Sequence, residues 1–299
     1  MKKNNFINFW LLLSVSMTTI VFNSCNKDDA PIDVTYISLD ILTLTLLVGE
    51  EYTLTATIIP NNADDKTVIW TSNDESKSTV VNGKVTAIST GMATITAKAG
   101  NQTATCIVEV YDENVIINGV KWSTRNVSYP GAFVDTPESG GQFYQWNRRT
   151  ADFLLRKDYE NSNHINSDSW LPANDPSPVG YRVPTLEEMQ SLLNTTYVSN
   201  TWAFRNGIKG IKFVDIATGN SIFLPANGNR YYADTNGKVY DYLRGEMGAY
   251  WSSTQINSMA NGVHTTANRL CFVNDALRNV FGVFWEAKHT ALSIRPVVK

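Results

Sequence analysis

The sequence predicts two folded domains of different class, an antiparallel β-sandwich followed by a domain that combines one helix with several strands. The chain has 299 residues, enough for two domains of about 100–200 residues each. Residues 33–111 are rich in Thr, Val and Ile that alternate along short segments, which is the pattern of half-buried strands. After residue 113 the composition changes to Trp, Tyr, Asn and Gly, and one helical pattern follows.

The N-terminal segment has the features of a secretory signal peptide. Lys2 and Lys3 give it a positive start, and residues 6–22 carry no charge. This run of 17 residues is shorter than the roughly 20 that cross a bilayer core, and it contains five polar residues. We therefore expect residues 1–24 to be removed rather than to span a membrane.

The end of this segment, Phe22-Asn-Ser-Cys25, places a small residue directly before a cysteine. It resembles the lipobox of bacterial lipoproteins. The resemblance implies a diacylglyceryl group on the Cys25 thiol, cleavage before Cys25 and acylation of the new amino group. Because two or more acyl chains anchor a protein stably, outer-membrane lipid is the expected partner of Cys25. The alternative is a signal peptide with a chance cysteine.

Residues 25–32 are expected to form a lipidated polar tether. Lys27, Asp28 and Asp29 resemble the surface-export signal of Bacteroidota lipoproteins. That resemblance implies display on the outside of the outer membrane, and a periplasm-facing lipoprotein is the alternative. The chain has 25 Lys and Arg against 28 Asp and Glu, a net charge of −3, which argues against a nucleic-acid partner and against electrostatic attachment to lipid headgroups.

The first folded domain is expected over residues 33–111. Apolar residues alternate with threonine over residues 52–58, and residues 93–97 and 104–110 alternate in the same way. The dipeptide Asn82-Gly83 between two valine-containing runs is typical of a two-residue hairpin turn. About seven short strands of this kind favour an antiparallel sandwich.

Short motifs run through this domain in a fixed order: Val48-Gly-Glu50, Leu54-Thr-Ala56, Pro60, Val68-Ile-Trp-Thr-Ser72, Gly83-Lys-Val-Thr-Ala87 and Gly91-Met-Ala-Thr-Ile95. Together they resemble the bacterial Ig-like domain, group 2. The resemblance implies an Ig-like sandwich that serves as a stalk or spacer, as such domains commonly do in surface proteins and adhesins. We expect Trp70 to pack in the core rather than to form a sugar platform, and Cys106 to be a buried thiol without chemistry.

The second domain is expected over residues 114–299. Thr185 and Glu188 have the spacing of a capping box, so a helix should begin after Thr185. The apolar stripe Leu186, Met189, Leu192 and Leu193 supports a helix that ends near Asn194. Strands are expected at residues 116–120, 211–214, 221–224, 270–273 and 291–298, with turn signals at Asn118-Gly119 and Asn236-Gly237.

The landmarks of this domain include Asn118-Gly-Val-Lys-Trp122, Tyr144-Gln-Trp146, Gly180-Tyr-Arg-Val-Pro184, Gly248-Ala-Tyr-Trp-Ser-Ser253 and Leu292-Ser-Ile-Arg-Pro-Val297. They resemble the Fibrobacter succinogenes major paralogous domain, a family similar to C-type lectins and to the formylglycine-generating enzyme. The resemblance implies an α+β C-type-lectin-like domain whose first and last strands lie together. Ser177 stands where members often carry cysteine, so a family disulfide is absent. Arg125, Arg182 and Arg295 are expected as structural partners of acids or carbonyls.

The sequence favours binding over catalysis. The calcium loop of C-type lectins, Glu-Pro-Asn or Gln-Pro-Asp followed by Trp-Asn-Asp, does not occur, and Trp251-Ser-Ser253 stands in the comparable strand. Cys271 lies in an apolar run, which predicts an inert core thiol, and no spacing marks a nucleophile beside a base. We therefore expect no metal, no cofactor and no enzymatic activity, while the paired carboxylates of a glycosidase stay an open alternative.

Sugars and peptides dock on exposed aromatic faces flanked by amides and arginines. Asn229, Arg230, Tyr231 and Tyr232 lie in a Gly- and Asn-rich segment, and with Trp202 they are the predicted ligand-binding residues. Packing is the favoured interpretation for the tryptophans, whereas packing and binding are equally open for the two tyrosines. Weaker candidates are Arg205, Tyr240 and Tyr242.

These observations predict a lipid-anchored protein of the outer membrane, displayed on the cell surface, in which an Ig-like stalk presents a C-type-lectin-like head. The expected role is non-catalytic adhesion or recognition of a glycan or a surface protein. Two alternatives from other classes are a structural or assembly subunit of a pilus or surface fibre, and a glycan-active enzyme. The sequence leaves the ligand and the oligomeric state open.

Overall fold

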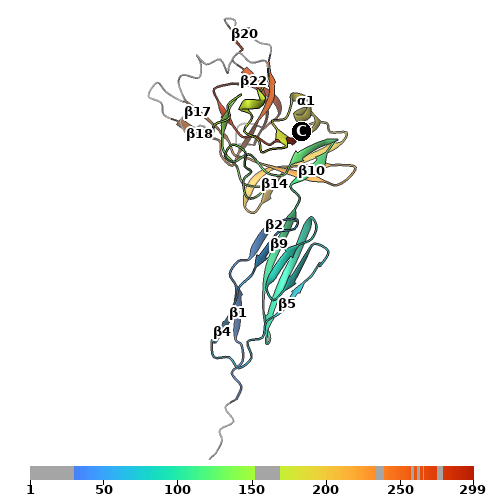
Figure 1. Ribbon diagram of the computed structural model, residues 1–299, viewed down its shortest axis with the longest axis vertical. Coiled ribbons are helices and arrows are strands. Elements are labelled where there is room, and N and C mark those ends of the chain that lie inside the picture. Colours follow the sequence, from blue (N-terminus) through green and yellow to red (C-terminus); the bar gives the residue numbers. More distant parts are fainter. Residues whose placement is uncertain are drawn as a thin grey trace, which may run out of the picture.

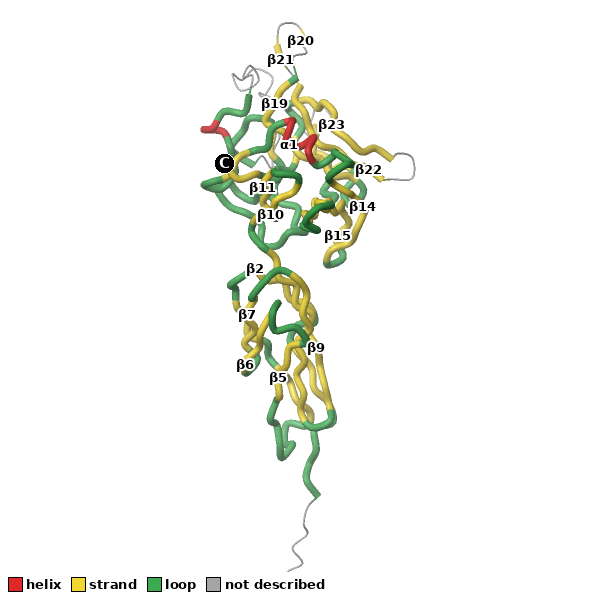
Figure 2. Tube along the Cα trace, turned by 90° about the vertical axis from the view of Figure 1, so that its right-hand side faces the viewer, coloured by secondary structure: helices red, strands yellow, loops and turns green. Residues whose placement is uncertain are grey.

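A computed structural model gives the arrangement of the chain in space (Figure 1). It describes residues 30–151, 169–232, 239–256, 259–260, 263–264, 266–274 and 279–299. The molecule is elongated, with a slender first domain and a wider second domain stacked on it, and the two views agree on this shape (Figures 1 and 2). None of the helices in the described ranges is long and apolar enough to span a bilayer.

The first domain is a β-sandwich, as the alternation of its residues predicts. One sheet contains β2 (Thr43–Leu47), β9 (Gln102–Tyr111), β8 (Gly91–Ala99) and β5 (Ile69–Ser72) in that order. The other strands form the sheet β3 (Glu51–Thr53), β7 (Lys84–Ala87) and β6 (Ser78–Val81), and the pair β1 (Tyr36–Leu39) and β4 (Ala56–Ile59). The expectation that all pairs are antiparallel is wrong at one place, because β2 and β9 run parallel.

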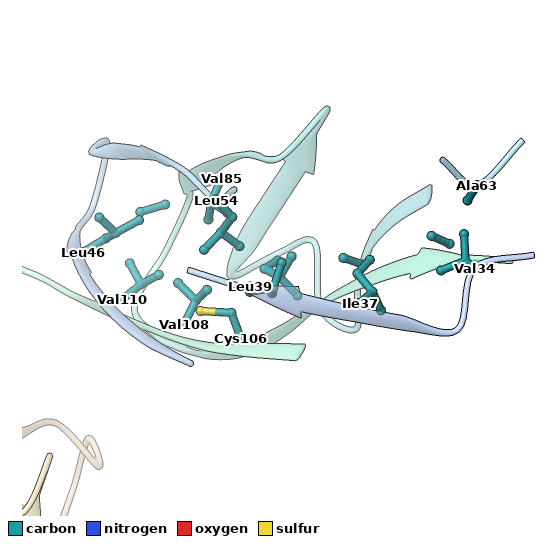
Figure 3. Close-up of a cluster of buried hydrophobic side chains, with 14 residues drawn as sticks. Val34, Ile37, Leu39, Leu46, Leu54, Ala63, Val85, Cys106, Val108 and Val110 are labelled. Atoms are coloured by element: carbon teal, nitrogen blue, oxygen red, sulfur yellow. The ribbon is translucent and has the colours of Figure 1, made fainter. Parts of the chain in front are cut away.

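The core of the first domain lies between these layers (Figure 3). Ile95 and Ala97 of β8 and Cys106 and Val108 of β9 are buried there, and the residues between them point outward, as predicted. The single strand expected over residues 52–58 is divided into β3 and β4, although its alternation of burial continues. The division arises because β3 pairs with β7 whereas β4 pairs with β1.

The Asn82-Gly83 turn forms the predicted hairpin between β6 and β7. Both residues have positive φ angles, 50° and 82°, which is the type I′ geometry that suits the twist of two strands. A Cβ atom at Gly83 would lie 2.7 Å from the carbonyl oxygen of Leu54 and 3.2 Å from the ring of Trp70. Trp70 therefore packs closely over this turn against the core, as expected, and Cys106 is confirmed as a buried thiol whose pKa burial raises to about 11.

The second domain consists mainly of strands. Two four-stranded sheets contain, in spatial order, β10 (Asn114–Ile117), β11 (Val120–Ser123), β25 (Val297–Val298) and β13 (Tyr181–Arg182), and β12 (Tyr144–Gln145), β24 (Ala291–Leu292), β17 (Asn229–Tyr232) and β18 (Val239–Tyr242). Two three-stranded sheets contain β14 (Val198–Arg205), β15 (Ile208–Asp215) and β16 (Ser221–Pro225), and β19 (Met247–Gln255), β22 (Thr266–Asn274) and β23 (Asn279–Ala287). The short strands β20 (Met259–Ala260) and β21 (Val263–His264) pair with each other. The described residues add one α-helix, α1 (Leu186–Ser191), and a 3₁₀ turn, η2 (Pro172–Asn174). The predicted α+β C-type-lectin-like class is thus not confirmed, because α1 is the only α-helix in the part of the domain that the structure describes.

Helix α1 begins as the capping box predicts. The Thr185 hydroxyl accepts a hydrogen bond from the Glu188 backbone N–H, and the Glu188 carboxylate accepts one from the Thr185 backbone N–H. Burial alone would raise the pKa of Glu188, but the two Arg182 hydrogen bonds and the cap hold it below its ordinary value. The helix ends at Ser191, earlier than expected, because the backbone N–H groups of Leu192, Leu193 and Asn194 donate to carbonyl oxygens three residues back and not four.

The first and last strands of the second domain lie together, as expected, since Trp122 of β11 pairs with Val297 of β25. The strand expected at residues 116–120 is instead a hairpin, β10 and β11, that turns at Asn118-Gly119. The strand expected at 291–298 is divided into β24 and β25, with Pro296, which has no N–H to donate, in the gap. The Asn236-Gly237 turn signal lies outside the described residues.

Arg295, between β24 and β25, is a buried structural cation, as predicted. Its Nε donates to Asn126 Oδ1 at 2.7 Å, and its terminal nitrogens donate to the carbonyl oxygens of Ser123, Pro137 and Phe223. Burial lowers the pKa of its guanidinium to about 10, so the group keeps its charge at neutral pH. The hydrogen bonds to these carbonyl oxygens replace the hydrogen bonds to water that the guanidinium loses on burial.

The two domains touch through the turn between β14 and β15. Arg205, the last residue of β14 before this turn, lies 3.2 Å from the Glu109 carboxylate in the first domain and 3.4 Å from Glu138 in its own domain. The neighbouring Asn206 amide donates to the Thr45 hydroxyl at 3.0 Å. Arg205, a weaker ligand candidate in the sequence, is therefore part of the domain joint.

Candidate functional site

The second domain has a cleft of about 780 Å³ between the β17–β18 hairpin and one face of the β19–β22–β23 sheet. We call it the aromatic cleft, after the aromatic residues in its lining: Tyr231, Tyr242, Phe284 and Trp285. Its other lining residues used below are Asn229, Arg269, Cys271, Val273, Val280, Glu286, His289 and Thr290.

The floor of the aromatic cleft follows from the register of β22 and β23. Cross-strand pairing places Arg269 beside Phe284, Cys271 beside Gly282 and Val273 beside Val280. Alternate residues of a strand point to the same face, so these positions share the face that meets the cleft. The opposite face, which carries Phe272 and Val283, packs into a separate core cluster of the domain.

The wall of the cleft is formed by β17 and β18. Asn229 and Tyr231 alternate with Arg230, so they face the cleft while Arg230 faces the other side of the hairpin. There the Arg230 guanidinium bonds to Asp241 at 2.7 Å, and it lies 5.4 Å from the Phe143 ring centroid. The hydrogen bond from Arg230 is the main cause that lowers the pKa of the Asp241 carboxyl.

Close backbone packing sets the position of this wall. A Cβ atom at Gly228, just before β17, would collide with the Tyr242 carbonyl oxygen, so only glycine lets the two strands meet here. The rings of Tyr231 and Tyr242 then contact each other edge to face, with centroids 5.8 Å apart and planes at 78°. This geometry is favourable for aromatic pairs and keeps both rings in a defined orientation.

Trp285 at the rim is the feature that the sequence interpretation missed. Its side chain is 66% exposed, and it is the only tryptophan of the described ranges in the exposed class. Packing was the expected fate of this residue, and that expectation is wrong. The available signal was the adjacent pair Phe284-Trp285, because consecutive residues of a strand point to opposite faces and a single core cannot bury both.

Polar side chains also line the aromatic cleft. The Arg269 guanidinium lies 3.3 Å from the Glu286 carboxylate, and the second Glu286 oxygen accepts a hydrogen bond from the Thr290 hydroxyl at 3.1 Å. Asn229 Oδ1 and Arg269 Nε and Nη1 are shielded from solvent and have no hydrogen-bond partner among the described residues. An unpaired buried polar group costs about 1–3 kcal/mol, so these atoms favour a ligand that can donate and accept.

The structure brings together only part of the predicted site. Asn229 and Tyr231 lie in the cleft, as does Tyr242 of the weaker candidates, whereas Arg230 faces away from it. Trp202 is not in the lining; its ring packs edge-on against Phe272 at 5.5 Å, with Lys209 Nζ 4.9 Å from the ring centroid. Outside the residues whose side chains the structure describes are Cys25, Lys27, Asp28, Asp29, Tyr232 and Tyr240.

The metal and thiol chemistry of the described part of the chain is limited. It contains no cluster of three or more His, Cys, Asp or Glu side chains that could hold a metal ion. Cys106 and Cys271 are buried, lie in different domains and form no disulfide. Cys271 sits in the floor of the cleft, and its burial agrees with the expected core thiol.

Comparison with known proteins identifies the first domain. The family model of the bacterial Ig-like domain (group 2) matches residues 33–110. Residues 33–110 are a bacterial Ig-like domain of group 2. An Ig-like virion protein of Serratia phage KSP90 is 42% identical over 85 residues, which cover 27% of this chain and 33% of the relative. A protein of Clostridium acetobutylicum is 40% identical over 74 residues, 23% of this chain and 19% of the relative.

These relatives match only part of their own length, a third and a fifth respectively. Among solved structures, domains 4 and 5 of the S-layer protein SbsC align with 27% of this chain and 53% of theirs at 23% identity, with a TM-score of 0.24. Domains 5 and 6 of SbsC align with 89% of this chain and 98% of their own length at 13% identity, with a TM-score of 0.25. TM-scores this low do not establish a shared fold, and the family of the second domain stays a prediction.

Proposed function

We propose that this protein is a lipid-anchored protein of the cell surface whose second domain recognises a glycan or a protein through the aromatic cleft, without catalysis. The cleft carries the proposal. Ligand sites are typically concave, lined by aromatic and apolar side chains, and supplied with a few fixed polar groups. The aromatic cleft has this composition, with four aromatic residues around the Arg269–Glu286 pair.

The surface location is supported by the order of the segments. The N-terminal residues resemble a lipoprotein signal that ends at Cys25, followed by the export-like residues Lys27, Asp28 and Asp29. The bacterial Ig-like domain comes next, and a relative of that domain is a virion protein. In Figure 1 the second domain lies at the end of the molecule opposite to β1 and β4 of the first domain, where a tethered stalk would hold it away from a membrane.

The absence of catalysis is supported by the charges of the lining. Glycosidases of the usual kind need two carboxylates that flank the scissile bond. Among the described residues that line the aromatic cleft, Glu286 is the only carboxylate, and it is paired with Arg269. Such an arrangement can bind a ligand but does not supply an acid and a base.

Display is tested with intact cells that express the full chain. An extracellular protease should release both domains, and radiolabelled fatty acid should appear on the wild-type chain but not on Cys25→Ala. A protected wild-type chain would contradict surface display. An unlabelled wild-type chain would contradict the lipid anchor.

Recognition is tested with the same cells on immobilised oligosaccharides and immobilised extracellular-matrix proteins. We expect Trp285→Ala to weaken adhesion to the bound surface about tenfold, because it removes the exposed ring of the cleft. The matched control is Phe204→Ala, which removes a ring that is 73% exposed on β14, outside the cleft. Equal adhesion of the two variants would refute the role of the cleft.

A second candidate function, an assembly subunit of a surface fibre, is supported by the edge strand β23. Within the described ranges no strand pairs with its outer side. Its nine residues include neither lysine nor proline, the residues that usually block such edges, and they expose Phe281, Phe284 and Trp285. Light scattering on the purified chain tests this role. A wild-type oligomer that Phe281→Lys converts to monomers favours it, and a monomer at high concentration rules it out.

A further inference from the structure

The ligand class of the aromatic cleft can be narrowed further. We propose that the cleft binds a neutral glycan without calcium, with one sugar packed against Phe284 on the floor and Trp285 at the rim, and with its hydroxyl groups bonded by Asn229, Arg269 and Glu286. This inference rests on the proposed recognition function and names the ligand of that site.

The stacking surface is the first argument. One face of a pyranose ring presents C–H groups, which pack against an aromatic ring that is open to solvent. Phe284 offers such a ring on the cleft face beside Arg269, and it is 40% exposed. Trp285 alternates to the other face of the edge strand β23 but still lines the rim of the cleft, and it is 66% exposed. Exposed aromatic residues that gather beside a concave surface mark interaction sites rather than ordinary surface.

The polar groups are the second argument. A hydroxyl group donates one hydrogen bond and accepts two, so it can bond to a carboxylate and a guanidinium at once. Arg269 and Glu286, whose Nη2 and Oε2 atoms are 3.3 Å apart, offer a donor and an acceptor side by side. Asn229 Oδ1 needs a donor and Arg269 Nη1 needs an acceptor, since neither has a partner in the described chain. The vicinal hydroxyls of a sugar supply both.

The backbone of the floor disfavours a peptide as the ligand. Peptides that bind to sheets usually add a strand at an edge, where main-chain groups are free. The cleft instead lies over the face of β22 and β23, which pair with each other from Thr266–Ala287 to Asn274–Asn279, whereas the free main-chain groups of β23 point to its outer edge. A ligand on this face is bound by side chains, which suits hydroxyl groups better than a peptide backbone.

The charges of the lining favour a neutral sugar and make calcium unnecessary. Arg269 and Glu286 are paired and neutralise each other, so an acidic sugar would lose as much from Glu286 as it gains from Arg269. A calcium ion takes six to eight oxygen ligands, most of them from several carboxylates and carbonyls. The described lining offers a single carboxylate, that of Glu286.

The test uses the mature chain, residues 25–299, with Cys25→Ser so that it stays unlipidated. It is applied to an array of neutral and acidic oligosaccharides and to an array of extracellular-matrix proteins, each with and without EDTA. The strongest glycan is then titrated calorimetrically against wild type, Trp285→Ala, Trp285→Phe and the control Phe204→Ala. We expect neutral glycans to bind with EDTA present, Trp285→Ala to weaken binding at least tenfold, Trp285→Phe to retain most of it, and Phe204→Ala to stay within twofold.

The outcomes separate this inference from the proposed function. Binding to a matrix protein alone, abolished by Trp285→Ala, would overturn the glycan ligand and leave recognition by the cleft intact. Glycan binding that is confined to acidic sugars, or that EDTA removes, would overturn the neutral, calcium-independent site. Binding of either class that Trp285→Ala leaves unchanged, or no binding on either array, would overturn both.

Discussion

Replacing Arg295 by methionine should destabilise the second domain strongly. Methionine fills a similar volume but removes every donor of the guanidinium. Two of the lost bonds are short, 2.7 Å to Asn126 Oδ1 and 3.1 Å to the Phe223 carbonyl, and the other two, to Pro137 and Ser123, are 3.3 and 3.4 Å. Hydrogen bonds to a charged group contribute about 1.5–3 kcal/mol each.

The net loss in the free energy of unfolding is smaller than the summed contributions of these hydrogen bonds, because the substitution also removes a charge that burial disfavours. The lowered pKa of Arg295, about 10, reflects that penalty. The short bonds dominate, so we expect the free energy of unfolding to fall by about 3–5 kcal/mol, because four buried neutral oxygens lose their donor at about 1–3 kcal/mol each, partly offset by the charge removed. For a domain of this size that loss lowers Tm by roughly 6–20 °C.

The assay is thermal unfolding followed by circular dichroism and tryptophan fluorescence. The matched control is Arg244→Met, which removes a guanidinium that is 63% exposed and paired with Asp241 at 3.1 Å. An exposed ion pair contributes at most about 1 kcal/mol, so this variant should melt close to wild type. If Arg295→Met also melts within about 2 °C of wild type, the buried network does not stabilise the domain as argued.

Three further predictions address the first domain, the joint and the cleft wall. Gly83→Ala should lower the free energy of unfolding of the first domain by at least about 1 kcal/mol, because its φ of 82° and the Leu54 oxygen at 2.7 Å leave no room for a methyl group; an unchanged urea midpoint would contradict this. Arg205→Ala should widen the distribution of molecular dimensions in small-angle scattering, because it removes the Glu109 contact across the joint, and an identical scattering curve would show that the joint does not need it. The pKa of Asp241 lies below its ordinary 3.8, so the stability that its ionised carboxylate contributes is fully present above pH 3.8 and is lost as the pH falls through the lowered pKa. Asp241→Asn should abolish this part of the acid dependence of Tm, and an equal slope of Tm against pH in both proteins would refute it.

The fold of the first domain could be predicted because its pattern is local. One face of β8 lies in the core, so the buried Ala93, Ile95 and Ala97 alternate with half-buried threonines in the sequence itself. The second domain gives a weaker signal. Six consecutive residues of β19, 247–252, are buried because both faces of the strand are covered, and such a strand shows no alternation.

The candidate site was predictable only in part, for a related reason. Asn229 and Tyr231 stood out because tyrosines in a Gly- and Asn-rich segment are unusual core residues. Arg230 was grouped with them, although strand alternation sends it to the other side of the hairpin. The exposure of Trp285 was missed, because it depends on which strand lies at the edge of the β19–β22–β23 sheet, and that order is set by contacts between distant segments.

The most direct test of the account is oxidation of tryptophan by N-bromosuccinimide, read out by peptide mass spectrometry. In the free protein Trp285 should react first, since Trp122, Trp146 and Trp251 are fully buried. At saturating concentrations of the bound glycan, Trp285 should be protected while the other sites react as before. If Trp285 is oxidised equally fast with the ligand bound, the ligand does not occupy the aromatic cleft and the central claim is contradicted.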